Sequence, residues 1–249
     1  MRRFSLTPLL LFTISLAPVG LTYAVPWDVS QLTDTAYDEY APQVLGSNVV
    51  WHVHDGNDYE VFFWNGSTTT QLTDNAYDDM DPQMSGSSIV WSAYVDGDYE
   101  ILVWDGLSTT QLTDNTDNDM WPQISGTKVA WCRELDGGDR EVFFWDGTQT
   151  FQLTDNEYHD DGPDLTGSSV VWHGHDGNDT EVFLWDGSST TQLTDNAHGD
   201  YRPQVSGPYV VWHGHDGSDY EIFVWNGTTT TQLTDNAHED WEPRVSGSN

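Results

Sequence analysis

Acidic side chains recur at fixed positions along this sequence, and carboxylates are groups that bind cations. One stands three residues before each of six regularly spaced prolines: Glu39, Asp79, Asp119, Asp160, Asp200 and Asp240. Six carboxylates around one opening would attract cations and could hold Ca²⁺, which prefers oxygen ligands. Alternatively, each caps its own loop by accepting backbone N–H groups. The pattern favours capping, because every repeat needs a cap whether or not a metal binds.

A second acidic pattern, Asp-Gly-x-Asp-x-Glu, recurs within the repeats. It is seen at Asp55, Asp58 and Glu60, at Asp176, Asp179 and Glu181, and at Asp216, Asp219 and Glu221. Its composition resembles that of a calcium loop, but it lacks the spacing of an EF-hand, and turn formation alone explains the Asp-Gly step. Three His-x-His pairs, which begin at His52, His173 and His213, show no third metal ligand. They are interpreted as polar positions between repeats.

A few residues differ from their counterparts in the other repeats, and a specific ligand site would use such unlike residues. The candidates for a ligand-binding face are Trp121, Trp241, Arg202 and Arg244, with His159 and Asp161 beside them. The sequence contains no Gly-x-Ser-x-Gly nucleophile motif and no glycine-rich phosphate loop, and it predicts no catalytic residue. It therefore favours a binding module over an enzyme. The alternative is a polysaccharide lyase or glycosidase that uses the unlike residues.

These side chains sit in a repeat of about 40 residues. Gln-Leu-Thr-Asp begins at residues 31, 71, 111, 152, 192 and 232. A fixed period of this length is typical of propellers and related repeat architectures. The one extra residue falls at Asp136–Asp139, which marks that stretch as a loop because insertions collect outside strands.

Each repeat is predicted to be β throughout. Short runs of β-branched and aromatic residues, such as 49–51 and 60–64, are bounded by glycine and are too short for helices. Asn65-Gly66 and its counterparts supply the positive φ angles of a tight hairpin turn. Four short antiparallel strands per repeat are typical of a propeller blade. We expect the recurrent tryptophans, such as Trp51 and Trp64, to pack between neighbouring blades.

The recurring phrase resembles the WD40-like repeat of TolB-type propellers. It comprises Gln-Leu-Thr-Asp-Asn, an acidic residue about five positions on, Pro-x-x-Ser and a Val-Val-Trp strand, and it covers residues 29–249. The family's Ser-Pro-Asp-Gly turn is replaced here by sequences such as Ser85-Gly86-Ser87, so the match is to a divergent branch. The resemblance implies an all-β propeller of four-stranded antiparallel blades.

The blade count follows from the repeats. Five complete blades are expected at residues 42–74, 82–114, 122–155, 163–195 and 203–235. Two further segments, 29–34 and 243–246, correspond to the outermost and innermost strands of one more blade and are expected to close the ring. We therefore expect a six-bladed propeller that is truncated at its C-terminal end; the alternative is an open last sheet, with edge strands available for self-association.

The first 24 residues have the layout of a secretory signal peptide. Two arginines precede the apolar run 9–16, and Thr22-Tyr23-Ala24 offers a cleavage site. The expected product is a secreted or periplasmic propeller domain over residues 25–249, with no membrane insertion after cleavage. An uncleaved anchor is the alternative.

The net charge of the chain restricts the classes of partner that it can bind. With 41 acidic and 7 basic residues the net charge is −34, which disfavours nucleic acid and favours cations or a basic protein or cell-envelope ligand. Oligomeric state is not specified by the sequence. Cys132 is the single cysteine, so no disulfide forms within the chain, and it is expected to fill a partly buried strand position.

Overall fold

The computed structural model describes residues 29–247, and the predicted signal peptide lies outside this range. The chain divides into two units, residues 1–38 and residues 39–249. The described part of the first unit contains no strand, and its Thr35 hydroxyl donates to the carbonyl of Tyr37. In the described residues no helix is long and apolar enough to cross a bilayer.

The second unit consists of five four-stranded antiparallel sheets, each formed by consecutive strands. Blade 1 contains β1 (Glu39–Leu45), β2 (Asn48–His54), β3 (Tyr59–Trp64) and β4 (Thr69–Gln71). Blade 2 contains β5 (Asp79–Ser85), β6 (Ser88–Val95), β7 (Asp98–Trp104) and β8 (Thr109–Gln111). Blade 3 contains β9 (Asn118–Ser125), β10 (Lys128–Glu134), β11 (Arg140–Trp145) and β12 (Thr150–Gln152). Blade 4 contains β13 (Asp160–Thr166), β14 (Ser169–His175), β15 (Thr180–Trp185) and β16 (Thr190–Gln192). Blade 5 contains β17 (Asp200–Ser206), β18 (Tyr209–His215), β19 (Tyr220–Trp225) and β20 (Thr230–Gln232).

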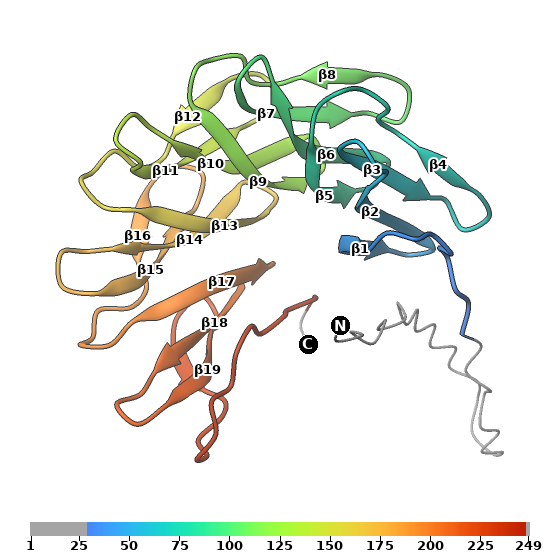
Figure 1. Cartoon of the computed structure of the whole chain (residues 1–249). Helices are drawn as coiled ribbons and strands as arrows, with labels where there is room; N and C mark the ends of the chain where they lie inside the picture. The colour runs from blue at the N-terminus through green and yellow to red at the C-terminus, as the bar shows by residue number, and fades with distance from the viewer. Residues whose placement is uncertain (1–28, 248–249) are drawn as a thin grey trace, which may run out of the picture. The chain divides into compact units, whose positions relative to one another are not determined.

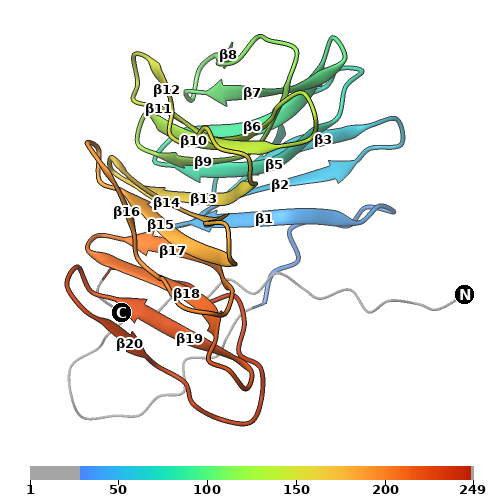
Figure 2. The same cartoon turned by 90° about the vertical axis from the view of Figure 1, so that its left-hand side faces the viewer.

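The five predicted blades are thus confirmed, and successive blades pack side by side with their first strands toward a common centre (Figures 1 and 2). The predicted hairpins are also present. Gly66 has a φ of 90°, and the Asn65 side chain accepts the backbone N–H groups of Ser67 and Thr68. Each first strand begins earlier than predicted, because the residues before the proline also pair with the second strand, as Asp79 does with Ala93.

The core lies between the blades. Four hydrophobic clusters each join one blade to the next; between blades 1 and 2, for example, Val50 and Val61 pack against Ile89 and Trp91. The second-strand tryptophans are at most 4% exposed, whereas the third-strand tryptophans, such as Trp104, are partly buried at the cluster edges. This confirms the predicted packing of tryptophan between blades, and it explains why one blade alone would leave an apolar face uncovered.

A β-bulge interrupts every first strand immediately before its proline. Ala41, Asp81, Trp121, Gly162 and Arg202 occupy the bulge in blades 1 to 5, all with φ between 45° and 59°. Side chains other than glycine are strained in this region, and such strain collects at functional positions. The bulge is also where the repeats differ most in sequence. This register position therefore carries a different residue in each blade, with backbone strain in the four blades where it is not glycine.

The two expected closing strands are not formed in the structure. Residues 29–34 and 243–246 belong to no strand. The bonds between 243–247 and β17 involve side chains of β17: Arg244 donates to the Gln204 side chain, and the Ser206 hydroxyl accepts from the Gly247 backbone N–H. Without a ladder of backbone bonds to a neighbour, a segment does not become a strand.

Candidate functional site

Four of the six recurrent carboxylates lie inside the protein. Asp79, Asp119, Asp160 and Asp200 each occupy a first strand and are at most 3% exposed. Buried carboxylates do not form the exposed cation-attracting ring that the sequence suggested. The capping alternative also needs correction, since the hydrogen-bond donors to these four are side chains. Glu39 begins β1, and Asp240 accepts from the Asn236 side-chain amide. A metal role for the six residues stays a prediction.

Each buried aspartate belongs to a network that we call the interblade latch, formed between blades 1 and 2 by Glu60, Thr73, Asn75, Asp79 and Trp91. The Asn75 backbone N–H donates to Glu60 Oε1 at 2.9 Å, and its side-chain amide donates to Asp79 Oδ2 at 2.7 Å. Trp91 Nε1 donates to Asp79 Oδ1 at 2.6 Å. The Thr73 hydroxyl accepts the Val61 backbone N–H at 2.8 Å. The latch thus ties β3 of one blade to β5 and β6 of the next.

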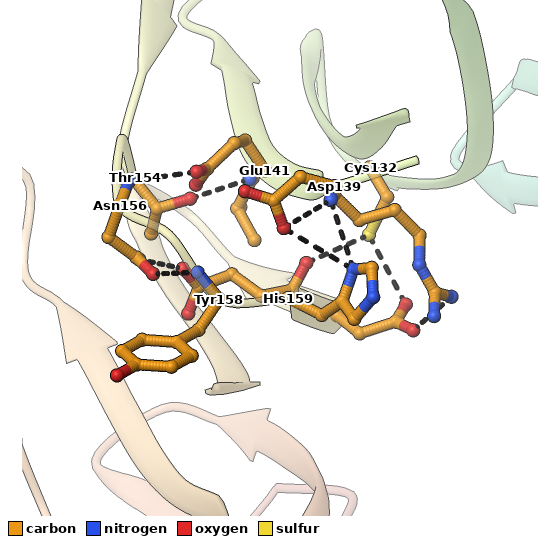
Figure 3. A network of polar contacts seen from close by, with 11 residues as sticks. Cys132, Asp139, Glu141, Thr154, Asn156, Tyr158 and His159 are labelled. Carbon is orange, nitrogen blue, oxygen red and sulfur yellow. Dashed lines mark hydrogen bonds and ion pairs between the residues drawn. The ribbon is translucent and has the colours of Figure 1, made fainter. Parts of the chain in front are cut away.

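Figure 3 shows the same arrangement where blade 3 meets blade 4. Asn156 donates its backbone N–H to Glu141 and its side-chain amide to Asp160. Glu141 also accepts from the Thr154 hydroxyl. The Thr-Asp-Asn of the repeat is therefore a structural motif, and its counterparts recur at every interface between the five blades. The recurrence that first suggested metal chemistry is explained by packing and hydrogen bonding.

Sequence reasoning missed the role of the latch glutamates. Glu60, Glu100, Glu141, Glu181 and Glu221 are at most 2% exposed. Burial raises the pKa of Glu60 and of Glu181 to about 7, against the opposing effect of hydrogen bonds from Thr and Asn. Burial likewise raises the pKa of Asp160 to about 6. The signal for these glutamates was their strict recurrence near the start of each third strand, immediately before an apolar residue.

A cleft of about 480 Å³ is the candidate ligand site. Blades 3, 4 and 5 and the segment that follows β20 contribute its walls; among its lining residues are Trp121, Arg140, Asp161, His173, Arg202 and Arg244. Residues 29–247 contain five basic side chains, which are Lys128, Arg133, Arg140, Arg202 and Arg244. Three of the five line this cleft, so most of the positive charge of a strongly acidic protein is gathered in one place.

Each of these arginines is held by a hydrogen bond or ion pair. Arg140 Nη1 lies 2.5 Å from Asp161 Oδ2, with its guanidinium 5.5 Å from the centre of the Trp121 ring. Arg202 pairs with Glu242 at 2.6 Å, and Arg244 donates to Gln204 Oε1 at 2.8 Å. A guanidinium has five N–H donors, so these contacts leave donors for a ligand. The cleft therefore presents pre-positioned cationic donors beside an aromatic ring.

The partly buried histidine of the cleft, His173, is electrically neutral near pH 7. Burial lowers the pKa of His173 to about 4, against the raising effect of Asp161. A second cavity, of about 520 Å³, shares Arg140, Asp161 and His173 with the cleft and extends toward His159 and Tyr201. The two cavities therefore adjoin at these three residues.

Three of the four residues predicted for a ligand face, Trp121, Arg202 and Arg244, lie in this cleft. Trp241 does not line it; its ring packs 4.2 Å from Tyr220 and 4.9 Å from His213, measured between ring centres. Trp121 occupies a bulge position, whereas Trp241 stands one position earlier in its repeat, where the side chain takes the opposite direction. The sequence missed Arg140, whose position in a third strand gave no sign that it reaches the cleft.

Cys132 has the predicted structural role. It is fully buried, with its Sγ 3.5 Å from Asp161 Oδ1, and burial together with the charge of Asp161 raises the pKa of its thiol. The structure therefore keeps this cysteine in the unreactive thiol form.

Comparisons with solved structures support the fold. A TolB-type structure from Agrobacterium tumefaciens matches with a TM-score of 0.59 and 20% identity, over 80% of this chain and 82% of that one. TolB from Acinetobacter baumannii matches with a TM-score of 0.51 and 14% identity, over 74% of this chain and 50% of that one. No protein-family model matches the sequence, and no curated protein matches it either.

A further match corrects the expectation that the chain is not an enzyme. An acylaminoacyl peptidase from Pyrococcus horikoshii matches with a TM-score of 0.63 and 12% identity, over 85% of this chain and 40% of that one. The same blade arrangement thus occurs within an enzyme, and the lack of a nucleophile motif in these repeats does not exclude enzymatic activity. Taken together, the sheets, the repeat and these likenesses show that the chain has the fold of the TolB-type β-propellers.

Proposed function

We propose that the chain is an exported binding module whose cleft holds an extended segment of a partner protein by a carboxylate of that segment. The observation that carries this proposal is the gathering of Arg140, Arg202 and Arg244 around one cleft. Guanidinium groups bind carboxylates with two parallel hydrogen bonds, and these are strongest where water is partly excluded.

Two features support a peptide segment as the ligand. The Trp121 ring is 38% exposed at the bulge beside Arg140, and exposed aromatic side chains are enriched at protein–protein contacts. Residues of three blades line the cleft, so an extended chain could contact several blades at once. The signal peptide expected at residues 1–24 would place the partner in the cell envelope or outside the cell. The strongly acidic remainder of the surface still favours cations and basic groups.

Selection of random peptides displayed on phage tests the proposal. We expect the wild-type protein to enrich peptides that contain Asp or Glu, and we expect the double variant Arg202→Gln/Arg244→Gln to lose at least tenfold in affinity for them. Lys128→Gln is the control, since it removes one positive charge outside the cleft and should leave binding unchanged. Enrichment of basic peptides, or equal binding by the double variant, would contradict the proposal.

A further inference from the structure

Three groups of carboxylates lie outside the cleft, in equivalent places on blades 1, 4 and 5. The groups are Asp55, Asp58 and Glu60; Asp176, Glu181 and Asp195; and Asp216, Glu221 and Asp235. Within each group, one oxygen of every residue lies within 4.8 Å of the others. Each group combines an aspartate of the loop between the second and third strands with the glutamate near the start of the third strand. The third member is the aspartate of Gln-Leu-Thr-Asp in blades 4 and 5, and a second loop aspartate, Asp58, in blade 1.

The glutamate of each group is buried and incompletely bonded. Glu60, Glu181 and Glu221 are 0% exposed. Their Oε1 atoms each accept a backbone N–H from the latch asparagine, but their Oε2 atoms have no hydrogen-bond partner. The same holds for one buried oxygen of Asp58, Asp179 and Asp219 in the loop before each glutamate. The blade 1 group therefore contains two buried acceptor oxygens without donors, and the groups of blades 4 and 5 contain one each, with a second on the neighbouring loop aspartate.

Such an arrangement is unfavourable unless a positively charged species is bound. A buried carboxylate oxygen without a donor costs several kcal/mol, and neighbouring carboxylates add repulsion. Among residues 29–247 no basic side chain forms an ion pair with any member of the three groups. When the glutamate is ionised, a cation from outside the chain would balance its charge.

Blades 2 and 3 show how the same position looks when the group is not assembled. In blade 2 the loop between the second and third strands is two residues shorter, and Glu100 Oε2 accepts from the Asn115 side chain at 3.4 Å. In blade 3 the loop is one residue longer, and Asp139 pairs with His159 at 3.4 Å. Glu141 Oε2 remains without a donor there, but no group of three carboxylates surrounds it.

We propose that blades 1, 4 and 5 each bind one Ca²⁺ through the buried glutamate and the surrounding aspartates. All available ligands are oxygens, which Ca²⁺ prefers and which bind it at 2.3–2.6 Å. Two oxygens on opposite sides of such an ion are separated by up to about 5 Å, in keeping with the spread of each group. The partly exposed aspartates leave room for water to complete the six to eight ligands that Ca²⁺ takes.

Isothermal titration calorimetry on the whole chain, stripped with EDTA and dialysed into 150 mM NaCl, tests this proposal. We expect three Ca²⁺ ions per chain, with Kd values of about 10⁻⁴ to 10⁻³ M or tighter, and at least tenfold weaker binding of Mg²⁺. Glu181→Gln keeps the acceptor for Asn196 and removes the charge, so it should bind two ions. If this variant does not fold, Asp235→Asn in blade 5 alters a more exposed ligand and should also bind two.

Glu100→Gln is the matched control, because Glu100 occupies the same latch position in a blade without the group; it should still bind three ions. Absence of saturable Ca²⁺ binding up to 5 mM would overturn the proposal. So would three ions bound to both Glu181→Gln and Asp235→Asn, because that result would assign the binding to the general negative charge. Equal affinity for Mg²⁺ would overturn the assignment of the sites to Ca²⁺.

Discussion

The buried aspartate of the latch accepts from two donors at once. Asp79 Oδ1 bonds to Trp91 and Oδ2 to Asn75, and all three side chains belong to the junction between blades 1 and 2. Asp79→Asn would leave one acceptor oxygen for two donors. Because a buried donor without a partner costs about 1–3 kcal/mol, we expect a loss of that size in the free energy of unfolding. Urea unfolding followed by tryptophan fluorescence would measure it.

Asp105→Asn is the matched control for that substitution. Asp105 accepts two backbone N–H groups in its hairpin turn, and Asn65 already accepts the equivalent bonds in blade 1. The control should therefore leave the unfolding midpoint unchanged. An equal loss of stability in both variants would show that the latch aspartate contributes no more to stability than the aspartate of a surface turn.

As the pH falls, the histidines whose pKa is lowered by burial should contribute a loss of stability. Burial, followed by the charge of Arg202, lowers the pKa of His213 to about 4, against the raising effect of Glu242. The ordinary value in an unfolded chain is about 6.5. Between these values the unfolded chain binds the proton and the folded chain does not, so the stability present above pH 6.5 is lost as the pH falls toward 4. His213 should account for about 2 kcal/mol between pH 7 and pH 5.

His213→Phe isolates this effect. Phenylalanine retains an aromatic ring among Tyr201, Tyr220 and Trp241, and His213 Nδ1 has no hydrogen-bond partner to lose. We expect the variant to show a smaller decrease in melting temperature between pH 7 and pH 5 than the wild type. Parallel pH profiles would contradict the prediction. Asp160 and Asp164, whose pKa burial raises to about 6, act in the opposite direction in both proteins and cancel in the comparison.

At the scale of the strand, the bulge of blade 4 requires glycine for two reasons. Gly162 has a φ of 59°, and a Cβ atom there would lie 2.8 Å from His173 Cε1. We expect Gly162→Ala to cost about 1–3 kcal/mol from backbone strain, with a further loss from the contact with His173. Thermal melts with Gly167→Ala as a control separate the two, since Gly167 has a φ of 60° and nothing within 4 Å of the added atom. Equal losses of stability in Gly162→Ala and Gly167→Ala would show that the contact with His173 adds nothing to the cost of backbone strain.

The strands and hairpins could be predicted from sequence because their signals are local. A run such as 49–51 and a turn such as Asn65-Gly66 need only their neighbours to define them. The bulges and the early start of each first strand could not be predicted, since both depend on pairing with the second strand, as between Tyr40 and His52. The expected strand at 243–246 failed for the same reason, because ladder bonds require a partner strand.

At the scale of the whole molecule, 41 acidic and 7 basic residues must make the folded chain repel itself. Salt screens this repulsion, with a Debye length of about 10 Å at 0.1 M. We therefore expect the melting temperature to rise as NaCl increases from 20 mM to 500 mM, and KCl to act equally. A fall in melting temperature would show that attractive pairs such as Arg140–Asp161 dominate. Millimolar Ca²⁺ adds little ionic strength, so an effect at that concentration is separate from screening.

The candidate site was only partly readable from the sequence. Trp121, Arg202 and Arg244 could be recognised because they break the repeat, but their assembly in one cleft depends on strands about 40 residues apart lying side by side. Arg140 and His173 reach the same cleft from a third and a second strand. The burial of four acidic positions could not be predicted, because a carboxylate that recurs in every blade has the same sequence signature whether it faces a channel or a tryptophan.

The latch has a consequence for how such a chain can lengthen over evolution. Its glutamate belongs to one blade, its threonine and asparagine to the connecting segment, and its aspartate and tryptophan to the next blade. A duplicated repeat begins with the aspartate and tryptophan that complete the junction with the blade before it. It ends with the glutamate, threonine and asparagine that begin the junction with the blade after it. Each inserted copy therefore arrives with matching contacts on both sides. Gene duplication can add a blade without any compensating substitution in its neighbours.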